Sequence, residues 1–282
     1  MIYYKKPFRR RPSTMQMKNY EIHIKDDCYD AVSFGSGKKD LVMIPGLGDG
    51  ITTVKGKALL GSVLYHRYGK KYRVTMISRK KTLESNATTE TMAKDQYYAM
   101  QALGIQKAHV LGVSMGGMFA QHLAADHPDM VDKLILVVTA PQCGDTAREN
   151  LQRWMGFARI KAYLGLMIDI TEKAHPEKYL KKLRPFYPYM GSAAKKMDTE
   201  RFLIQAKACE EHNALEKLEK IQSPTLIIGG GQDRTLGEEG SHLLHRFIEG
   251  SRIKIYIDQG HALYEDEKDF HTTCLSFLEE EA

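Results

Sequence analysis

Long apolar runs are missing from this sequence of 282 residues. No stretch approaches the roughly 20 consecutive apolar residues that a helix needs to cross a bilayer. The basic N-terminus, with Lys5, Lys6 and arginines at positions 9 to 11, is not followed by the apolar segment of a secretory signal. We therefore predict a protein that folds in water without stable membrane insertion, and we interpret residues 1–18 as a basic flexible tail.

Motifs for metal and redox chemistry are also missing. The four cysteines lie far apart and form no C-x-x-C pair, and the eleven histidines form no H-E-x-x-H motif. Scattered cysteines are compatible with a reducing compartment, so a cytoplasmic protein is predicted. A net charge of +6 and one basic cluster form too loose a pattern to predict a nucleic-acid partner. We expect no metal and no cofactor.

Short apolar runs that alternate with helical segments are what the sequence does contain. This alternation predicts an α/β fold with a mostly parallel, doubly wound sheet. Segments 20–24 and 29–34 alternate in polarity around Asp26 and Asp27, which predicts an antiparallel hairpin at the sheet edge. The other predicted strands are 41–44, 73–78, 109–113, 133–138, 225–228 and 253–257. The predicted core helices are 53–66, 92–103, 118–125 and 268–279.

A long segment without strand signals interrupts this alternation between residues 145 and 216. Its helical sequence is broken at Pro176, Pro185 and Pro188, because proline ends or kinks a helix. We interpret it as an inserted helical cap, which leaves 19–144 and 217–282 as the two halves of the core. Its many apolar side chains are expected to pack the cap and to border a pocket. The basic pairs Lys181-Lys182 and Lys195-Lys196 are interpreted as solvated faces.

The strongest candidate for catalysis is Ser114, within Gly112-Val113-Ser114-Met115-Gly116-Gly117. A serine on a very sharp turn between a strand and a helix leaves room only for small residues two positions before and after it. Gly112 and Gly116 meet this requirement, and the motif directly follows an apolar strand. The pattern therefore predicts a nucleophile elbow that lifts the Ser114 hydroxyl out of the sheet.

A catalytic serine needs a base, and the base needs a carboxylate that orients it. His261 and Asp233 each follow a predicted strand and at least one glycine, and the chain order Ser, Asp, His fits this kind of site. Asp145 and Asp258 stay open as alternatives for the carboxylate, with Asp233 preferred for its glycine-rich strand end. We predict Ser114, Asp233 and His261 as the catalytic residues.

Acyl transfer also needs N–H donors aimed at the developing oxyanion. The backbone N–H of Met115 is available at the start of the helix that follows the elbow. The loop Pro45-Gly46-Leu47-Gly48 follows a central strand, and the N–H of Leu47 is the expected second donor. We predict Leu47 and Met115 as the oxyanion hole.

The elbow, the Asp233 loop and the Gly260-His261 pair make the chain similar to the lid-bearing α/β-hydrolase superfamily from about residue 20 to the C-terminus. This resemblance implies the α/β-hydrolase fold and the same roles for the predicted triad and oxyanion donors. Many members have His-Gly where this chain has Pro45-Gly46. Dehalogenases and epoxide hydrolases of the fold resemble it less, since their nucleophile is aspartate and the nucleophile predicted here is Ser114.

We accordingly predict a carboxylesterase-like serine hydrolase. Its small-molecule acyl substrate would be a small to medium, partly apolar ester, thioester or lactone, cleaved through an acyl-enzyme on Ser114. A carbon–carbon bond hydrolase or a cofactor-free haloperoxidase-like enzyme is the alternative that uses the same triad. A small-molecule receptor built on the hydrolase scaffold is the alternative from another class, although a binding protein does not need an activated nucleophile. The sequence specifies no oligomeric state.

Overall fold

A sheet of eight strands forms the centre of the computed structural model, which describes residues 17–281. The strands are β1 (Lys18–Ile24), β2 (Asp27–Phe34), β3 (Lys39–Ile44), β4 (Tyr72–Ile77), β5 (Ala108–Val113), β6 (Val131–Val137), β7 (Thr225–Gly230) and β8 (Arg252–Tyr256). Their order across the sheet is β1-β2-β4-β3-β5-β6-β7-β8. β2 is antiparallel to both β1 and β4, and the remaining neighbours are parallel. The predicted sheet with an antiparallel hairpin at its edge is confirmed.

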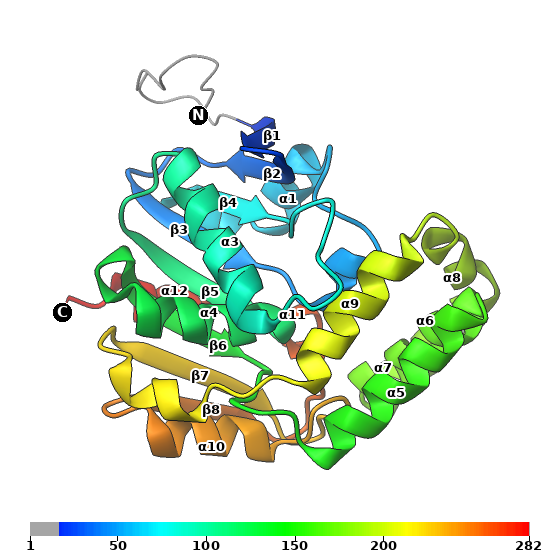
Figure 1. Ribbon diagram of the computed structural model, residues 1–282. Coiled ribbons are helices and arrows are strands. Elements are labelled where there is room, and N and C mark those ends of the chain that lie inside the picture. Colours follow the sequence, from blue (N-terminus) through cyan, green and yellow to red (C-terminus); the bar gives the residue numbers. More distant parts are fainter. Residues whose placement is uncertain (1–16, 282) are drawn as a thin grey trace.

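Helices cover both faces of this sheet (Figure 1). They are α1 (Ala58–Leu64), α2 (His66–Gly69), α3 (Thr89–Ala102), α4 (Met115–Asp126), α10 (Glu239–Phe247), α11 (Leu263–Asp266) and α12 (Phe270–Glu279). Successive side chains of a strand point to opposite faces, so Val42 and Ile44 of β3 pack with α3 and α4. Leu41 and Met43 pack with α12 on the other face. Residues 1–16 of the predicted tail lie outside the described residues, and its last residue, Lys18, begins β1.

The chain leaves the sheet after β6 and forms five helices before it returns as β7 (Figure 1). These are α5 (Asp145–Arg159), α6 (Tyr163–Ala174), α7 (Glu177–Leu183), α8 (Tyr187–Ala194) and α9 (Thr199–Glu210), and we refer to them as the cap. Short 3₁₀ turns are η1 (Leu47–Gly50), η2 (Pro128–Met130), η3 (Arg184–Phe186) and η4 (Leu215–Lys220). Pro176 precedes the first residue of α7, where its missing N–H costs little. Among the described residues, no helix is long and apolar enough to span a membrane.

The helix predicted over about 53–66 is shorter in the structure, where α1 occupies Ala58–Leu64. The Thr53 hydroxyl donates to Asp30 (3.0 Å), and the Val54 N–H donates to the Ser78 hydroxyl (2.9 Å). These contacts with the sheet hold the segment outside a helix, and Gly56 adopts a positive φ of 74°. The helix α1 therefore begins at Ala58.

Helix α3 begins three residues before its predicted start at 92. The Thr88 hydroxyl accepts from the Thr91 N–H (3.1 Å), and the Thr91 hydroxyl accepts in return from the Thr88 N–H (2.8 Å). This reciprocal cap satisfies two N–H groups at the helix N-terminus and fixes its first turn.

Candidate active site

Ser114 lies between the last residue of β5 and the first residue of α4. Its backbone has φ 54° and ψ −122°, a conformation that L-residues rarely adopt and that costs free energy. The Ser114 N–H donates to the Val137 carbonyl on the neighbouring strand (2.8 Å), and its own carbonyl accepts from the Gly117 N–H (2.8 Å). The turn is therefore held from both sides.

Glycines make this turn possible. A Cβ atom on Gly116 would lie 2.0 Å from the Ile44 carbonyl oxygen, and one on Gly112 would lie 2.5 Å from the Gly116 oxygen. Neither space admits a side chain, because backbone atoms occupy it. The end of β3, the end of β5 and the start of α4 can thus approach one another only with glycine at these positions.

The three residues predicted as catalytic lie in one chain of hydrogen bonds. His261 Nε2 lies 2.9 Å from Ser114 Oγ, and His261 Nδ1 lies 2.7 Å from Asp233 Oδ2. His261 and Asp233 are buried, whereas Ser114 is partly accessible. The loops after β7 and β8 supply the carboxylate and the imidazole, because the carboxyl ends of parallel strands meet at one edge of the sheet.

The second oxygen of Asp233 is also occupied. Asp233 Oδ1 accepts from the backbone N–H groups of Thr235 (2.8 Å) and Leu236 (2.9 Å). These two hydrogen bonds fix the orientation of the carboxylate. The Asp233 carboxylate accepts a hydrogen bond from His261 Nδ1–H, so the lone pair of Nε2 is left facing the serine hydroxyl.

The two alternative carboxylates lie elsewhere. Asp145 is the first residue of α5 and is exposed, and Asp258 is exposed in the loop after β8. The hydrogen-bonded carboxylate partner of His261 among the described residues is Asp233.

The two predicted oxyanion donors lie at helix N-termini next to Ser114. Met115 is the first residue of α4 and Leu47 is the first residue of η1, where N–H groups have no acceptor within the helix. The Leu47 loop passes close to the elbow, since a Cβ on Gly46 would lie 3.2 Å from Ser114 Cβ. Both donors border the same cavity as Ser114 and His261.

This cavity has a volume of about 450 Å³ and lies between the sheet edge and the cap. Its walls are mainly apolar. From the cap come Leu151, Trp154, Ile170, Ala174 and Phe202, and from the core come mainly aliphatic, methionine and aromatic side chains. Such a space fits a small or medium organic molecule with an apolar part.

The cap is joined to the loop that carries His261. The backbone N–H of Ala262, next to His261, donates to the Ala174 carbonyl at the end of α6 (2.9 Å). His175, the residue after α6, makes a second contact: its Nδ1 lies 2.8 Å from Oδ2 of Asp266, the last residue of α11. The imidazole loop is therefore braced by the cap and not only by the sheet.

A second junction joins the cap to the Leu47 loop, and sequence reasoning missed it. Arg201 of α9 donates to the Asp49 backbone oxygen and to Asp49 Oδ2, both at 2.7 Å. Burial lowers the pKa of the neighbouring Arg79 guanidinium to about 10, and the negative charge of Asp49, 3.8 Å away, only partly opposes this shift. The same guanidinium lies over the Phe119 ring. No motif marks these residues, because helix α9 lies 150 residues from Asp49 along the chain.

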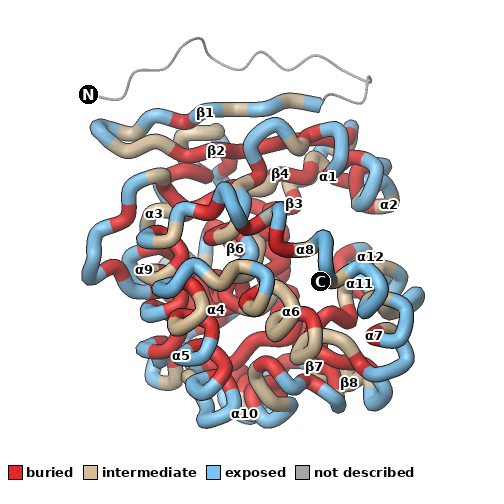
Figure 2. Tube along the Cα trace, turned by 90° about the vertical axis from the view of Figure 1, so that its right-hand side faces the viewer, coloured by how far each residue is buried: buried red, intermediate tan, exposed pale blue. Residues whose placement is uncertain are grey.

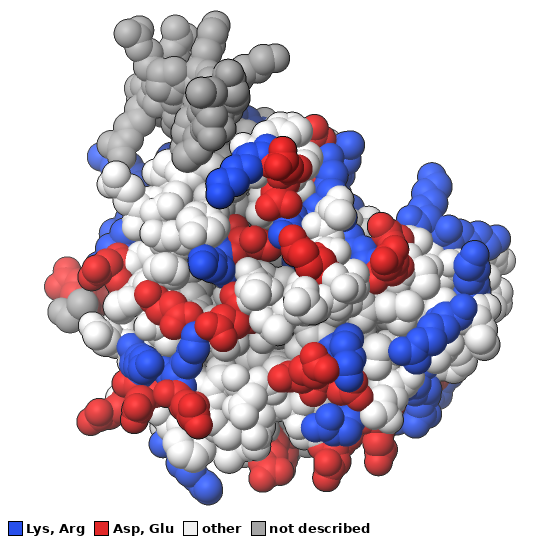
Figure 3. Space-filling view, viewed as in Figure 1, with Lys and Arg blue, Asp and Glu red and all other residues white. Residues whose placement is uncertain are grey.

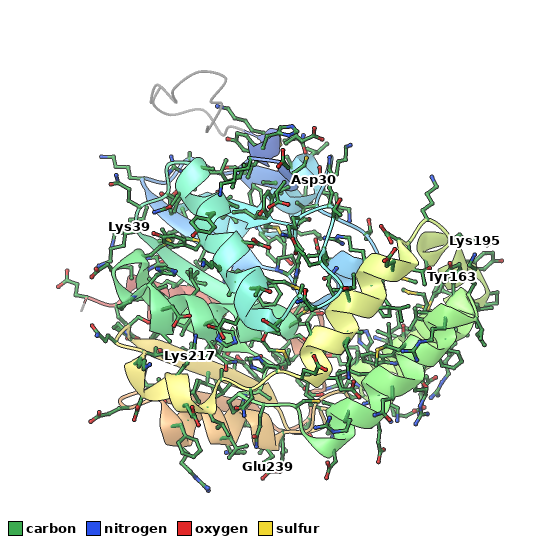
Figure 4. The ribbon with its side chains drawn as sticks, in the orientation of Figure 1. Asp30, Lys39, Tyr163, Lys195, Lys217 and Glu239 are labelled. Carbon is green, nitrogen blue, oxygen red and sulfur yellow. The ribbon has the colours of Figure 1, made fainter. Side chains whose placement is uncertain are left out.

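The basic pairs of the cap lie on its surface. Lys181, Lys182, Lys195 and Lys196 are all exposed, so their interpretation as solvated faces is confirmed. In Figure 4 the side chain of Lys195 points away from the cap, and Figure 3 shows lysine and arginine side chains along the outer edge of this part of the molecule.

One group of described residues could offer three ligands to a metal ion. Glu21, His23 and Cys28 lie together on the β1–β2 hairpin, at the sheet edge. The ammonium group of Lys81 already binds Glu21 (2.6 Å), which disfavours a second cation there. The hairpin contributes no residue to the active-site cavity, so this group of possible metal ligands is separate from Ser114, His261 and Asp233.

Comparison with known proteins identifies the family of the chain. Residues 59–268 match the family described as alpha/beta hydrolase fold. The chain is 26% identical over 278 residues to a 2-hydroxy-6-oxononadienedioate/2-hydroxy-6-oxononatrienedioate hydrolase of Klebsiella pneumoniae, covering 93% of this chain and 92% of that protein. It is 30% identical over 170 residues to a pimeloyl-[acyl-carrier protein] methyl ester esterase of Neisseria meningitidis, covering 55% of this chain and 62% of the esterase.

A solved structure shows the same fold. The enol-lactonase from Burkholderia xenovorans LB400 superimposes with a TM-score of 0.80 at 19% sequence identity, covering 93% of this chain and all of that one. The relatives are named as hydrolases and esterases, which supports an enzyme of the hydrolase type. The chain belongs to the alpha/beta hydrolase fold family.

Proposed function

We propose that this hydrolase cleaves a carboxylic ester, or a related thioester or lactone, through an acyl-enzyme on Ser114. The observation that carries the proposal is the continuous hydrogen-bond chain from Ser114 through His261 to Asp233, which opens on an apolar cavity. A serine hydroxyl needs such a base to become a nucleophile at neutral pH.

In the first half of the reaction, Ser114 Oγ attacks the carbonyl carbon while His261 Nε2 takes the hydroxyl proton. The carbonyl oxygen becomes an oxyanion, which accepts from the N–H groups of Leu47 and Met115. The tetrahedral intermediate then collapses: the bond between the carbonyl carbon and the alkoxy oxygen breaks, and the leaving alcohol takes the proton from His261.

In the second half, water attacks the acyl carbon and gives its proton to His261 Nε2. The bond to Ser114 Oγ breaks, the acid leaves, and the proton returns to the serine. Asp233 stays ionised throughout and stabilises the imidazolium each time it forms. The net change consumes one ester and one water and produces one acid and one alcohol.

The cavity supports a small or medium substrate with an apolar part. A volume of about 450 Å³ lies within the range of pockets that enclose small ligands, and its walls are mainly aliphatic and aromatic. We further propose a cytoplasmic enzyme, since the four cysteines are free thiols in the structure, as expected in a reducing compartment.

Carbon–carbon bond hydrolysis is the second candidate. It is favoured by similarity over 93% of the chain to the hydrolase of an oxo-dienedioate from Klebsiella pneumoniae. The methyl ester esterase and the enol-lactonase among the similar proteins favour ester or lactone cleavage instead.

A substrate panel with matched variants tests the proposal. The panel contains p-nitrophenyl esters of increasing acyl length, an enol-lactone and a vinylogous 1,5-diketone acid as the carbon–carbon substrate. We expect hydrolysis of short or medium esters, a loss of about 10³-fold or more in Ser114→Ala, and full activity in Ser192→Ala, which changes an exposed serine of the cap. Hydrolysis of the diketone acid alone, or full ester activity in Ser114→Ala, would overturn the proposal.

A further inference from the structure

Charged side chains are scarce along the active-site cavity. Of the described lysines, arginines, aspartates and glutamates, Asp49 and Lys57 are the two that line it. Asp49 is buried, and its carboxylate accepts from Arg201 (2.7 Å) and lies 3.8 Å from the Arg79 guanidinium. Two guanidinium groups of the protein therefore already balance this carboxylate. The remaining charge on the cavity wall is the ammonium group of Lys57.

The backbone holds Lys57 in a defined position at the border of the cavity. Lys57 directly precedes α1, where its N–H donates to the Val54 carbonyl (3.0 Å) and its carbonyl accepts from the Gly61 N–H (2.8 Å). Val54 is itself tied to the sheet, because its N–H donates to the Ser78 hydroxyl (2.9 Å). In Figure 2 α1 lies at the surface of the molecule beside β2. The side chain of Lys57 thus starts from a fixed point between the surface and the cavity.

The ammonium group of Lys57 has one hydrogen-bond partner in the protein. Lys57 Nζ donates to the Thr52 hydroxyl (3.0 Å) and forms no ion pair with any residue that the structure describes. An ammonium group carries three N–H donors, so two are left for other acceptors. Burial lowers the pKa of Lys57, and the negative charge of Asp49 only partly opposes this shift. The cation is partly removed from water without a carboxylate beside it, and an anionic ligand would stabilise it.

Thr52 connects this ammonium group to the loop that carries the proposed oxyanion donor. The Thr52 N–H donates to the Gly48 carbonyl (3.0 Å), within the turn that begins at Leu47. Thr52, Lys57 and Leu47 all line the cavity together with Ser114. One bound molecule can therefore place its reacting carbonyl at Ser114 and a second polar group at Lys57.

The surrounding walls make such a contact selective. They are mainly apolar, and in pockets of this kind a few placed polar groups determine which ligand binds. A single cation matches the single charge of a carboxylate, whereas a phosphate group carries a charge of about −1.5 to −2 at neutral pH. A carboxylate is also a strong acceptor for the free N–H donors of an ammonium group.

We propose that Lys57 binds a carboxylate of the substrate, so that the preferred substrate is an ester, thioester or lactone that carries this second, anionic group. The inference rests on the proposed function and deepens it by naming the substrate class. The apolar chain between the carboxylate and the reacting carbonyl packs on the aliphatic and aromatic walls. The carboxylate can belong to the acyl part or to the alcohol part of the ester, because either part offers the same contact to Lys57.

Matched pairs of esters test the proposal through the ratio of their kcat/KM values. The acyl pair is the monoethyl ester of adipic acid and its neutral analogue, in which an isopropyl group replaces the carboxylate. The alcohol pair is the acetate ester of γ-hydroxybutyric acid and its isopropyl analogue. Wild type should prefer the anionic member of at least one pair by about tenfold or more. The preference should come mainly from a lower KM, because a contact remote from the reacting carbon stabilises the bound substrate and the transition state alike. The pair that shows it identifies the part of the ester that carries the carboxylate.

Variants at position 57 assign this preference to the ammonium group. Lys57→Met should bring the two members of the pair to within about threefold of each other, and Lys57→Glu should reverse the preference. Lys57→Arg keeps the positive charge and should retain the preference. Lys55→Met is the matched control and should keep the wild-type ratio, since Lys55 is exposed and does not line the cavity. Each ratio compares two substrates on one protein, so a partial loss of folded enzyme does not change it.

Binding without turnover separates this inference from the ester hydrolysis proposed above. Calorimetry with Ser114→Ala should give a Kd for the anionic ester about tenfold lower than for its neutral analogue, and Ser114→Ala/Lys57→Met should lose the difference. Equal Kd values in Ser114→Ala, a preference that survives in Lys57→Met, or an equal loss in Lys55→Met would overturn the role of Lys57. Equal hydrolysis of both members of each pair would overturn it as well and leave ester hydrolysis standing. A Kd difference in a chain that cleaves no ester would support Lys57 and contradict only the hydrolysis.

Discussion

Arg201 of the cap donates to both the backbone oxygen and the carboxylate of Asp49, two residues after Leu47. The contact is buried, and Arg201 also donates to the backbone oxygens of Arg79 (3.0 Å) and Lys80 (3.2 Å). One cap side chain therefore holds two loops of the core, including the loop proposed to bind the oxyanion.

The first prediction concerns this junction. Arg201→Met should destabilise the fold by about 3–5 kcal/mol, because the buried Asp49 carboxylate loses its main partner. A displaced Leu47 loop should lower kcat by tenfold or more with a smaller change in KM, since the oxyanion forms only along the reaction. Urea unfolding and steady-state kinetics measure both effects. The control is Arg184→Met, which removes an exposed cap arginine from its ion pairs with Glu172 and Glu177 and should change the free energy of unfolding and kcat little. Equal losses in kcat in the two variants would contradict the prediction.

The second prediction identifies the carboxylate. Asp233→Asn should reduce kcat by about 10³–10⁴-fold, because a neutral amide does not stabilise the imidazolium as a carboxylate does. Asp145→Asn and Asp258→Asn should retain wild-type activity, since both side chains are exposed and away from His261. Steady-state kinetics on an ester decide the matter, and a comparable loss in either control would reassign the carboxylate.

The third prediction uses two glycines that differ in their surroundings. Gly116→Ala would place a Cβ 2.0 Å from the Ile44 oxygen, so we expect a loss of about 3 kcal/mol or more in the free energy of unfolding, together with loss of esterase activity. Gly156→Ala in helix α5 meets nothing within 4 Å and should stabilise the protein by up to about 1 kcal/mol. Chemical unfolding of the two variants compares them, and a Gly116→Ala protein as stable as wild type would refute the close approach at the elbow.

These glycines illustrate what the sequence could predict. A strand, a glycine-flanked serine and a helix form a local pattern, so the elbow and the strand ends that carry Asp233 and His261 follow from residues close together in the chain. The junction of Arg201 with Asp49 does not, because nothing in either local sequence records a contact across 152 positions. The start of the helix predicted over about 53–66 was wrong for the same reason, since distant partners at Asp30 and Ser78 hold its first residues outside the helix.

The fourth prediction concerns stability at acid pH. Burial lowers the pKa of His122 to about 4 and that of His212 to about 3, and both rings share the Thr89 hydroxyl. As pH falls below the ordinary histidine pKa near 6.5, the unfolded chain takes up protons that the folded protein does not. The free energy of unfolding should therefore fall between about pH 6.5 and 4, by up to about 1.4 kcal/mol per pH unit for each histidine, and should stay high above pH 6.5.

Unfolding measurements across this pH range in wild type and His122→Gln test the fourth prediction. The variant should show a shallower dependence on pH, by close to one proton, whatever its stability at neutral pH. An unchanged slope would exclude His122 as the source.

The most direct test of Ser114 as the nucleophile is labelling with a fluorophosphonate followed by intact and peptide mass spectrometry. We predict one adduct per chain, on the peptide that contains Ser114, with no adduct in Ser114→Ala and much slower labelling in a His261→Gln variant of the same melting temperature. A correctly folded protein that takes no label, or a label that persists in Ser114→Ala, would contradict an activated serine at this site.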